Sequence, residues 1–218
     1  MQQYAKGIRK PFPYHFSNYS LILIGLNIAV YFLISLFPQI RTYLALNPVL
    51  FLQKHFYWTP LTYMFVHGGM NHILFNMLGL FFFGPQLEER MGSFEFLLYY
   101  FLTGILSGLF SLMVYLATGS YLVFLMGASG GLFAILLAFA VYFPHSKVYL
   151  FGILPMKTTV MVTLYAAIEI FSMVFGMQGG VAHMTHLAGL FFGYLYFIIR
   201  LRTDPIAVFK DSRGNHWN

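Results

Sequence analysis

The sequence lacks cysteine and has few charged residues. Lys, Arg, Asp and Glu together make up 8% of its 218 residues, whereas apolar residues make up 59% and aromatic residues 20%. The absence of cysteine excludes disulfides, thiolate nucleophiles and cysteine-based metal sites. So low a charge content does not suit the water-exposed surface of a domain of this size. We therefore expect most of the surface to contact lipid.

Apolar runs long enough to cross a bilayer recur along the chain. About 20 helical residues cross about 30 Å of hydrocarbon. The runs are continuous rather than alternating, which favours helices over a barrel, because backbone in lipid must satisfy its own hydrogen bonds. Six runs have this character: Tyr19–Phe37, Gly69–Gly84, Phe94–Ala117, Gly127–Phe143, Thr158–Phe175 and Val181–Ile199. We predict an all-α membrane protein whose six-helix domain covers residues 19–202, between an N-terminal segment 1–18 and a C-terminal tail 203–218.

Basic residues predict the orientation of these helices. Lys and Arg are retained on the cytoplasmic side during insertion. With six spans, one side carries Lys6, Arg9, Lys10, Arg90, Lys147, Lys157, Arg200, Arg202, Lys210 and Arg213, and the other carries Arg41 and Lys54. We expect both termini to be cytoplasmic, and the compact core without a long transit peptide favours a prokaryotic plasma membrane. The net charge of +6 then reflects topology and anionic lipid, so no nucleic-acid partner is expected.

Two features of the first spans complete the outline of the fold. The first run is too long for the apolar part of a signal peptide and lacks a small-residue cleavage pattern, so we expect it to remain as a helix. The segment from Pro38 to Gly68 is rich in aromatic and apolar residues. Such a composition is typical of structure that lies in the membrane interface. We expect an interfacial outer loop between the first and second helices.

The fourth run is short because Pro144 ends it. A short span can begin below the membrane surface, and irregular backbone at that depth is tolerated where it lines a wet cavity. Ser129 lies at this recessed end. We therefore expect water to reach a serine within the membrane.

Ionisable and polar side chains inside membrane spans are costly and mark function. Within the predicted spans and at their outer ends they are few, and the predicted topology places most of them at one level near the outer side. They are His67, Asn71, His72, Asn76, Ser129, Glu169, His183 and His186. This level is the candidate site.

A serine at this level can act as a nucleophile if a base and oxyanion donors lie close to it. We predict that Ser129 is the nucleophile and that His186 removes its proton. The free backbone N–H of Ser129, at a helix N-terminus, is a predicted oxyanion donor. His72 and Asn76 share one helix face at i, i+4 spacing and are predicted to supply two more donors.

Small residues predict that the fourth and sixth helices touch. Gly127 and Gly130 flank the serine, and Gly189 and Gly193 form a small-xxx-small ridge one turn beyond the histidine. Backbones can then approach closely enough for a Ser–His hydrogen bond. Phe133, one turn after the serine, is predicted to stack on the imidazole and to fix it without an acid.

In combination, four segments resemble motifs of the rhomboid family of six-helix intramembrane serine proteases, over roughly Trp58 to Arg202. Gly127–Gly130 resembles its GxSG motif, and His186–Gly193 resembles its HxxGxxxG motif. His72–Asn76 resembles its HxxxN segment and Glu88–Ser93 its ExRxGS segment.

The resemblance implies roles for particular residues. His72 and Asn76 would stabilise the oxyanion, and Glu88 and Arg90 would form a structural ion pair that braces the inner end. Thr59 departs from the family, which usually has arginine after the loop tryptophan, and this departure puts the anchoring of the loop in question.

The expected activity is cleavage of transmembrane segments near their outer end through an acyl-enzyme. The substrate is itself a membrane helix, so we expect it to enter laterally between the second and fifth helices, with Gly176–Gly180 as a lid. Transmembrane proteins and the lipid bilayer are the expected partners, and no cofactor or metal is expected. Oligomeric state, substrate and process are left open.

Several alternatives remain. His183, one turn from His186, is a second candidate base. His67, His72, His183 and His186 could converge on a metal, although no HExxH pattern supports it. Glu169 is predicted chiefly as a protonated group bonded to a neighbouring helix, with gating or a third catalytic position as the alternative. A non-catalytic rhomboid-like protein that binds membrane helices is the main functional rival, and a small transporter or channel is the second.

Overall fold

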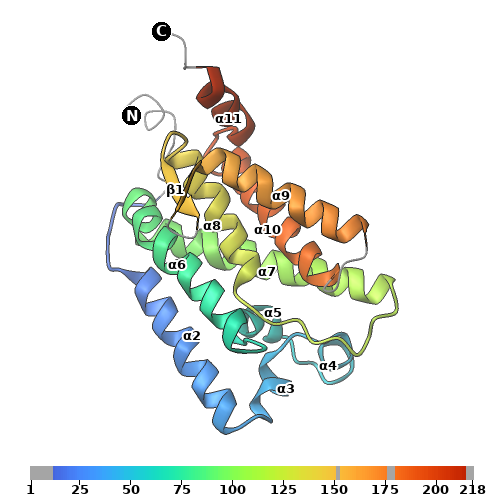
Figure 1. Ribbon diagram of the computed structural model, residues 1–218. Helices are drawn as coiled ribbons and strands as arrows, with labels where there is room; N and C mark the ends of the chain where they lie inside the picture. Colours follow the sequence, from blue (N-terminus) through green and yellow to red (C-terminus); the bar gives the residue numbers. More distant parts are fainter. Residues whose placement is uncertain (1–11, 151–152, 176–179, 215–218) are drawn as a thin grey trace.

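The computed structural model describes residues 12–150, 153–175 and 180–214, and most of them are helical. Long helices form a bundle: α2 (Tyr19–Leu36), α6 (Met70–Met91), α7 (Ser93–Ala117), α8 (Ser129–Tyr142), α9 (Thr158–Val174) and α10 (Gly180–Ile199) (Figure 1). The shorter elements are α3 (Ile40–Leu44), α4 (Pro48–Gln53), α5 (Thr59–Thr62), η1 (Tyr63–Phe65), β1 (Lys147–Leu150), β2 (Leu154–Lys157) and α11 (Pro205–Gly214).

The long helices coincide with the predicted apolar runs, with one clear difference. The second predicted run ends at Gly84, whereas α6 continues through Pro85 to Met91. By length and apolarity, α2 and α7 are each sufficient to cross a membrane, while α8, α9 and most of α10 are shorter apolar helices. The helical bundle agrees with the predicted fold class, and the count of six spans stays a prediction.

A two-stranded antiparallel hairpin departs from the all-α prediction. Strands β1 and β2 pair in a register that runs from Lys147↔Lys157 to Leu150↔Leu154. Pro144 follows the end of the preceding helix, and the β-branched and aromatic residues Val148 and Tyr149 favour a strand. The tail predicted from residue 203 also contains structure, namely α11.

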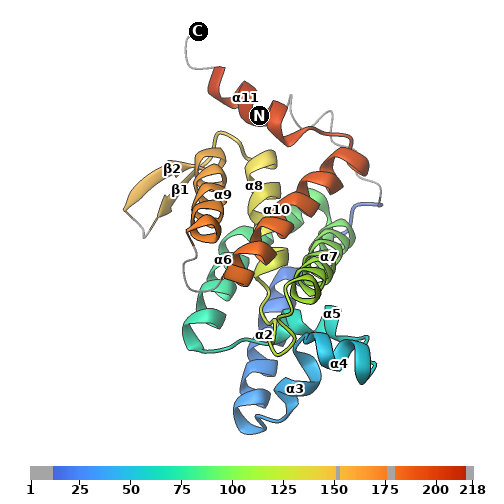
Figure 2. The same ribbon diagram turned by 90° about the vertical axis from the view of Figure 1, so that its right-hand side faces the viewer.

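The short elements gather at opposite ends of the bundle. The hairpin and α11 lie at one end, and α3, α4 and α5 lie at the other (Figures 1 and 2). Asn47 ties the latter group to the segment before α8, because its amide nitrogen donates to the carbonyl oxygens of Tyr121 and Val123, both at 3.0 Å. Leu46 and Leu125 form a β-bridge beside this contact.

The loop that carries Thr59 is anchored without the arginine usual in the family. The indole N–H of Trp58 donates to the carbonyl oxygen of Tyr43 at 2.8 Å. Thr59 is fully buried, and its hydroxyl donates to the carbonyl oxygen of Phe56 at 2.7 Å. A short, locally bonded side chain therefore occupies this position.

Helix α8 lies at the centre of the bundle. It packs against α6, α7, α9 and α10, and nearly all its side chains are buried (Figure 2). Its 14 residues extend about 21 Å, less than the hydrocarbon thickness of a bilayer. The predicted short helix is confirmed, although it begins at Ser129 rather than Gly127.

Glycines set the distance between α8 and α10. A Cβ atom at Gly189 would overlap the carbonyl oxygen of Gly130, and one at Gly193 would lie 2.6 Å from the Tyr99 hydroxyl and 3.3 Å from Ala134 Cα. Direct backbone contact between the two helices therefore requires glycine at position 189. The close approach predicted from the glycine ridge is present.

Glu88 does not make the predicted ion pair. Its carboxylate accepts hydrogen bonds from the backbone N–H groups of Tyr19 and Ser20, both at 2.8 Å, and from the Ser93 hydroxyl at 2.5 Å. These donors satisfy a fully buried acid, so among the described residues it forms no ion pair with Arg90. Glu88 instead satisfies free N–H groups at the start of α2.

A second buried carboxylate does form an ion pair. Glu95 of α7 accepts from the guanidinium of Arg200 at 2.8 Å and from the Tyr196 hydroxyl. Arg200 follows the C-terminus of α10, so this pair joins the ends of α7 and α10.

We predict that Gly189→Ala lowers the stability of the bundle. The added methyl group must push α10 away from α8, which we expect to cost about 1–3 kcal/mol. Thermal unfolding of the detergent-solubilised protein, followed by circular dichroism, measures the effect. Gly25→Ala is the matched control, because nothing lies within 4 Å of that position and alanine favours the helix. Equal unfolding midpoints for the two variants would contradict the packing argument.

Candidate active site

Backbone geometry places Ser129 at the first position of α8. The residue two places before it, Gly127, has φ +126°, and its N–H donates to the carbonyl oxygen of Tyr63 at 3.0 Å. A Cβ atom at Gly127 would also lie 2.7 Å from His72 Nε2. Both constraints require glycine. The first N–H groups of α8, including that of Ser129, have no acceptor within the helix.

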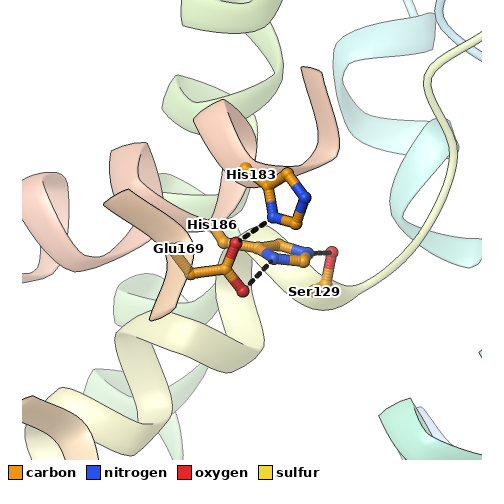
Figure 3. A network of polar contacts seen from close by, with 4 residues as sticks. All are labelled: Ser129, Glu169, His183 and His186. Carbon is orange, nitrogen blue, oxygen red and sulfur yellow. Dashed lines mark hydrogen bonds and ion pairs between the residues drawn. The ribbon is translucent and has the colours of Figure 1, made fainter. Parts of the chain in front are cut away.

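The structure brings Ser129 and His186 together. His186 Nε2 of α10 lies 2.8 Å from Ser129 Oγ, within hydrogen-bond distance (Figure 3). Phe133 stacks on the imidazole with ring centroids 4.3 Å apart and planes 7° from parallel. The pair and its stacking partner therefore have the geometry that the sequence predicts.

His72 and Asn76 lie on α6, across from the serine. The Asn76 amide nitrogen donates one hydrogen to the His72 carbonyl oxygen at 2.8 Å. The second hydrogen of this NH2 group takes no part in that bond. A Cβ atom placed on Gly127 would lie within 4 Å of both His72 Nε2 and Ser129 Oγ. His72 therefore lies close to the serine, and Asn76 lines the same cavity.

A cavity of about 680 Å³ contains this region. Its lining comes from α6, α8, α9 and α10 and from the segment before α8. The lining includes Asn71, His72, Phe75, Asn76, Gly79, Met126, Ser129, Leu132, Phe133, Tyr165, Ile168, Glu169 and His186. Helix α9 packs mainly against α8 and α10 rather than α6, so the cavity occupies the space between α6 and α9.

Glu169 of α9 makes contacts that the sequence left open. Its two carboxylate oxygens lie 3.0 Å from His186 Nδ1 and 2.5 Å from His183 Nδ1 (Figure 3). The preferred prediction, a protonated acid bonded to a neighbouring helix, specified neither the helix nor the partner. The alternative of a third catalytic position placed Glu169 near His186, and the structure has that contact. The signal was the i, i+3 spacing of the two histidines, which places both rings on one face of α10.

The metal alternative takes a different form in the structure. The ligand atoms of Glu169, His183 and His186 lie within 4.8 Å of one another, and carboxylate and imidazole are common zinc ligands. The set considered from the sequence instead included His67 and His72. Their rings lie 5.1 Å apart on the α6 side of the site.

The structure is a bundle of mostly apolar helices in which a serine and a histidine lie within hydrogen-bond distance. Comparison with known families identifies the class of protein. The Rhomboid domain matches residues 54–203, which are more than half of the sequence. The chain belongs to the rhomboid family.

Relatives come from several kinds of organism. The chain is 31% identical to the mitochondrial Rhomboid protein 1 of Saccharomyces cerevisiae, with 85% of this chain and 55% of the relative covered. It is 28% identical to the rhomboid protease GlpG of Haemophilus influenzae, with 86% and 94% covered. Inactive RHOMBOID-like protein 8 of Arabidopsis thaliana is 33% identical over 28% of this chain and 17% of its own length. The chain therefore spans about half the length of the yeast relative.

His67 generates a prediction about stability and pH. It lies before α6, is almost fully buried, and neither ring nitrogen has a hydrogen-bond partner among the described residues. Burial, and secondarily the charge of His72, lower the pKa of His67 from 6.5 to about 4. The unfolded chain therefore binds a proton that the folded protein does not, so stability falls as the pH drops from about 6.5 to about 4.

We expect His67→Phe to lose this pH dependence, which amounts to about 3 kcal/mol at most. Unfolding midpoints measured from pH 7 to pH 4 provide the test. His15→Phe, which replaces an exposed histidine by the same residue, is the matched control. Identical slopes in His67→Phe and wild type would show that His67 does not carry the effect.

Proposed function

We propose that this protein is an intramembrane serine endopeptidase that cleaves transmembrane segments of other membrane proteins with a Ser129–His186 dyad. The observation that supports it most directly is the 2.8 Å contact between Ser129 Oγ and His186 Nε2 beside a cavity, in a chain of the rhomboid family. No cofactor takes part in the proposed reaction.

The proposed chemistry is acyl transfer. His186 Nε2 takes the proton of Ser129 as Oγ attacks the scissile carbonyl carbon, and the imidazolium then gives that proton to the leaving amine. Water, activated by the same imidazole, hydrolyses the acyl-enzyme. The Ser129 N–H and the side chains of His72 and Asn76 donate hydrogen bonds to the oxyanion.

The proposed substrate route runs between α6 and α9. The cavity lies there, its lining is largely apolar, and α6 and α9 do not pack extensively against each other. A membrane helix that enters laterally and unwinds locally can present an extended peptide bond to Ser129. The predicted lid, Gly176–Gly180, lies outside the described residues except for its last glycine.

The proposal also includes the membrane topology. Six spans place both termini in the cytoplasm and the site toward the outer side of a prokaryotic plasma membrane, so that cleavage falls near the outer end of the substrate. The distribution of lysine and arginine supports this arrangement.

The alternative is a non-catalytic protein that binds membrane helices, and one relative carries the description inactive. An incomplete dyad is expected of such a protein. Here serine and histidine are both present and in hydrogen-bond contact, which favours catalysis.

We expect the full chain in lipid vesicles to cleave a transmembrane test substrate and to react with a fluorophosphonate probe at Ser129. Ser129→Ala should abolish both activities, and His186→Ala should lower the rate by at least about 10³-fold, because the nucleophile loses its base. Gel-based cleavage, mass spectrometry of the labelled peptide and a chelator control provide the measurements.

Gly25→Ala is the control that retains wild-type cleavage, since its position is exposed and an added methyl group meets nothing within 4 Å. Cleavage that survives Ser129→Ala would overturn the serine mechanism. Binding of the test helix without cleavage or labelling would support the non-catalytic alternative.

A further inference from the structure

A buried carboxylate that the dyad does not require lies next to it. Glu169 is 8% exposed, and its two oxygens contact two histidines of α10. Burying an ionisable group is costly unless it is paired, so its retention beside the catalytic pair calls for a specific interaction.

The imidazole of His186 is contacted through both of its nitrogens. Nδ1 faces Glu169 Oε1 at 3.0 Å, and Nε2 faces Ser129 Oγ at 2.8 Å (Figure 3). A carboxylate accepts but does not donate, so the proton of the neutral ring belongs on Nδ1. Nε2 then presents its lone pair to the serine hydroxyl, as a general base requires.

Stacking by Phe133 cannot determine which ring nitrogen of His186 carries the proton. Phe133 lies parallel to the ring and fixes its plane, but a ring face offers no acceptor in the plane of the two nitrogens. The aromatic contact therefore leaves the tautomer free, and the carboxylate determines it.

We propose that Glu169 is a positioning residue that extends the dyad to a Ser129–His186–Glu169 triad. The inference rests on the proposed function. Glu169 holds the Nδ1–H tautomer and stabilises the imidazolium that forms when the serine proton moves to Nε2. It takes up no proton itself and touches no substrate.

His183 holds the carboxylate in place. Its Nδ1 lies 2.5 Å from Glu169 Oε2, and its ring is nearly perpendicular to that of His186. The two histidines therefore bind different oxygens of one carboxylate. His183 does not contact Ser129 among the described residues, so it supports the triad from the far side of Glu169.

The test compares steady-state cleavage by wild type and Glu169→Gln in vesicles. Glutamine keeps the shape but removes the charge, so kcat should fall about 10²-fold while KM stays within about twofold. A smaller loss than the roughly 10⁴-fold effect of removing the acid from a serine protease triad is expected, because Phe133 retains the ring plane. Fluorophosphonate labelling of Ser129 should slow by the same factor.

Two variants give matched controls. Glu95→Gln removes a different buried carboxylate, remote from the serine, and should lower the unfolding midpoint without changing kcat. His183→Gln should lower kcat by less than about tenfold, since Glu169 still reaches His186. A loss in His183→Gln as large as that in His186→Ala would assign the base role to His183 and overturn the triad.

A double-mutant cycle separates positioning from a structural role. If Glu169 acts through His186, Glu169→Gln causes no further loss in the His186→Ala background. A further loss there would overturn the proposal, as would an unchanged kcat in folded Glu169→Gln. If Glu169→Gln does not fold, the test uses Glu169→Asp, because aspartate keeps the charge but its shorter side chain withdraws the oxygens from His186. The kcat of Glu169→Asp should also fall. A wild-type kcat in that variant would contradict the proposal.

The measurements distinguish a failure of the triad from a failure of the proposed function. Absence of Ser129-dependent cleavage in the wild type would contradict the proposed protease function itself. Ser129-dependent cleavage together with a wild-type kcat in Glu169→Gln would contradict the triad alone.

Discussion

The contact between the backbones of α8 and α10 is the constraint on which the site depends. Gly189 lies against the carbonyl group of Gly130. Gly130 is one residue after Ser129, and Gly189 is three residues after His186. A side chain at this crossing would force the helices apart, because its Cβ atom would overlap the carbonyl oxygen of Gly130. The 2.8 Å distance between serine and imidazole therefore depends on helix packing.

The position of Ser129 depends on a second constraint, the segment that precedes α8. This segment is held by Asn47, by the bridge between Leu46 and Leu125 and by the bond from Gly127 to Tyr63. The elements α3–α5 and η1 thus determine where α8 begins. A helix shorter than the bilayer can carry its first residue at depth because that short end is bound to other parts of the chain.

Much of this arrangement could be predicted from the sequence, because long apolar runs, Pro144 and spaced glycines act locally. The Ser129–His186 contact and the Phe133 stack followed from spacing along two helices. Partners distant in sequence were harder to predict. Glu88 binds the start of α2 rather than Arg90. The contact of Glu169 with His186 was only an alternative prediction, and its contact with His183 was not predicted. A pattern identifies a helix face, but the rotation of each helix in the bundle determines which side chain it meets. The β1–β2 hairpin depended on weak strand preferences within a charged loop.

The place of Glu169 on α9 has a consequence for timing. Its carboxylate is bonded to α10 and also lines the cavity between α6 and α9. If a substrate helix enters there as proposed, a rigid outward displacement of α9 would widen the cavity and also withdraw the carboxylate from the imidazole. The carboxylate can stay bonded to His186 during entry only if α9 bends above Glu169, within its last five residues.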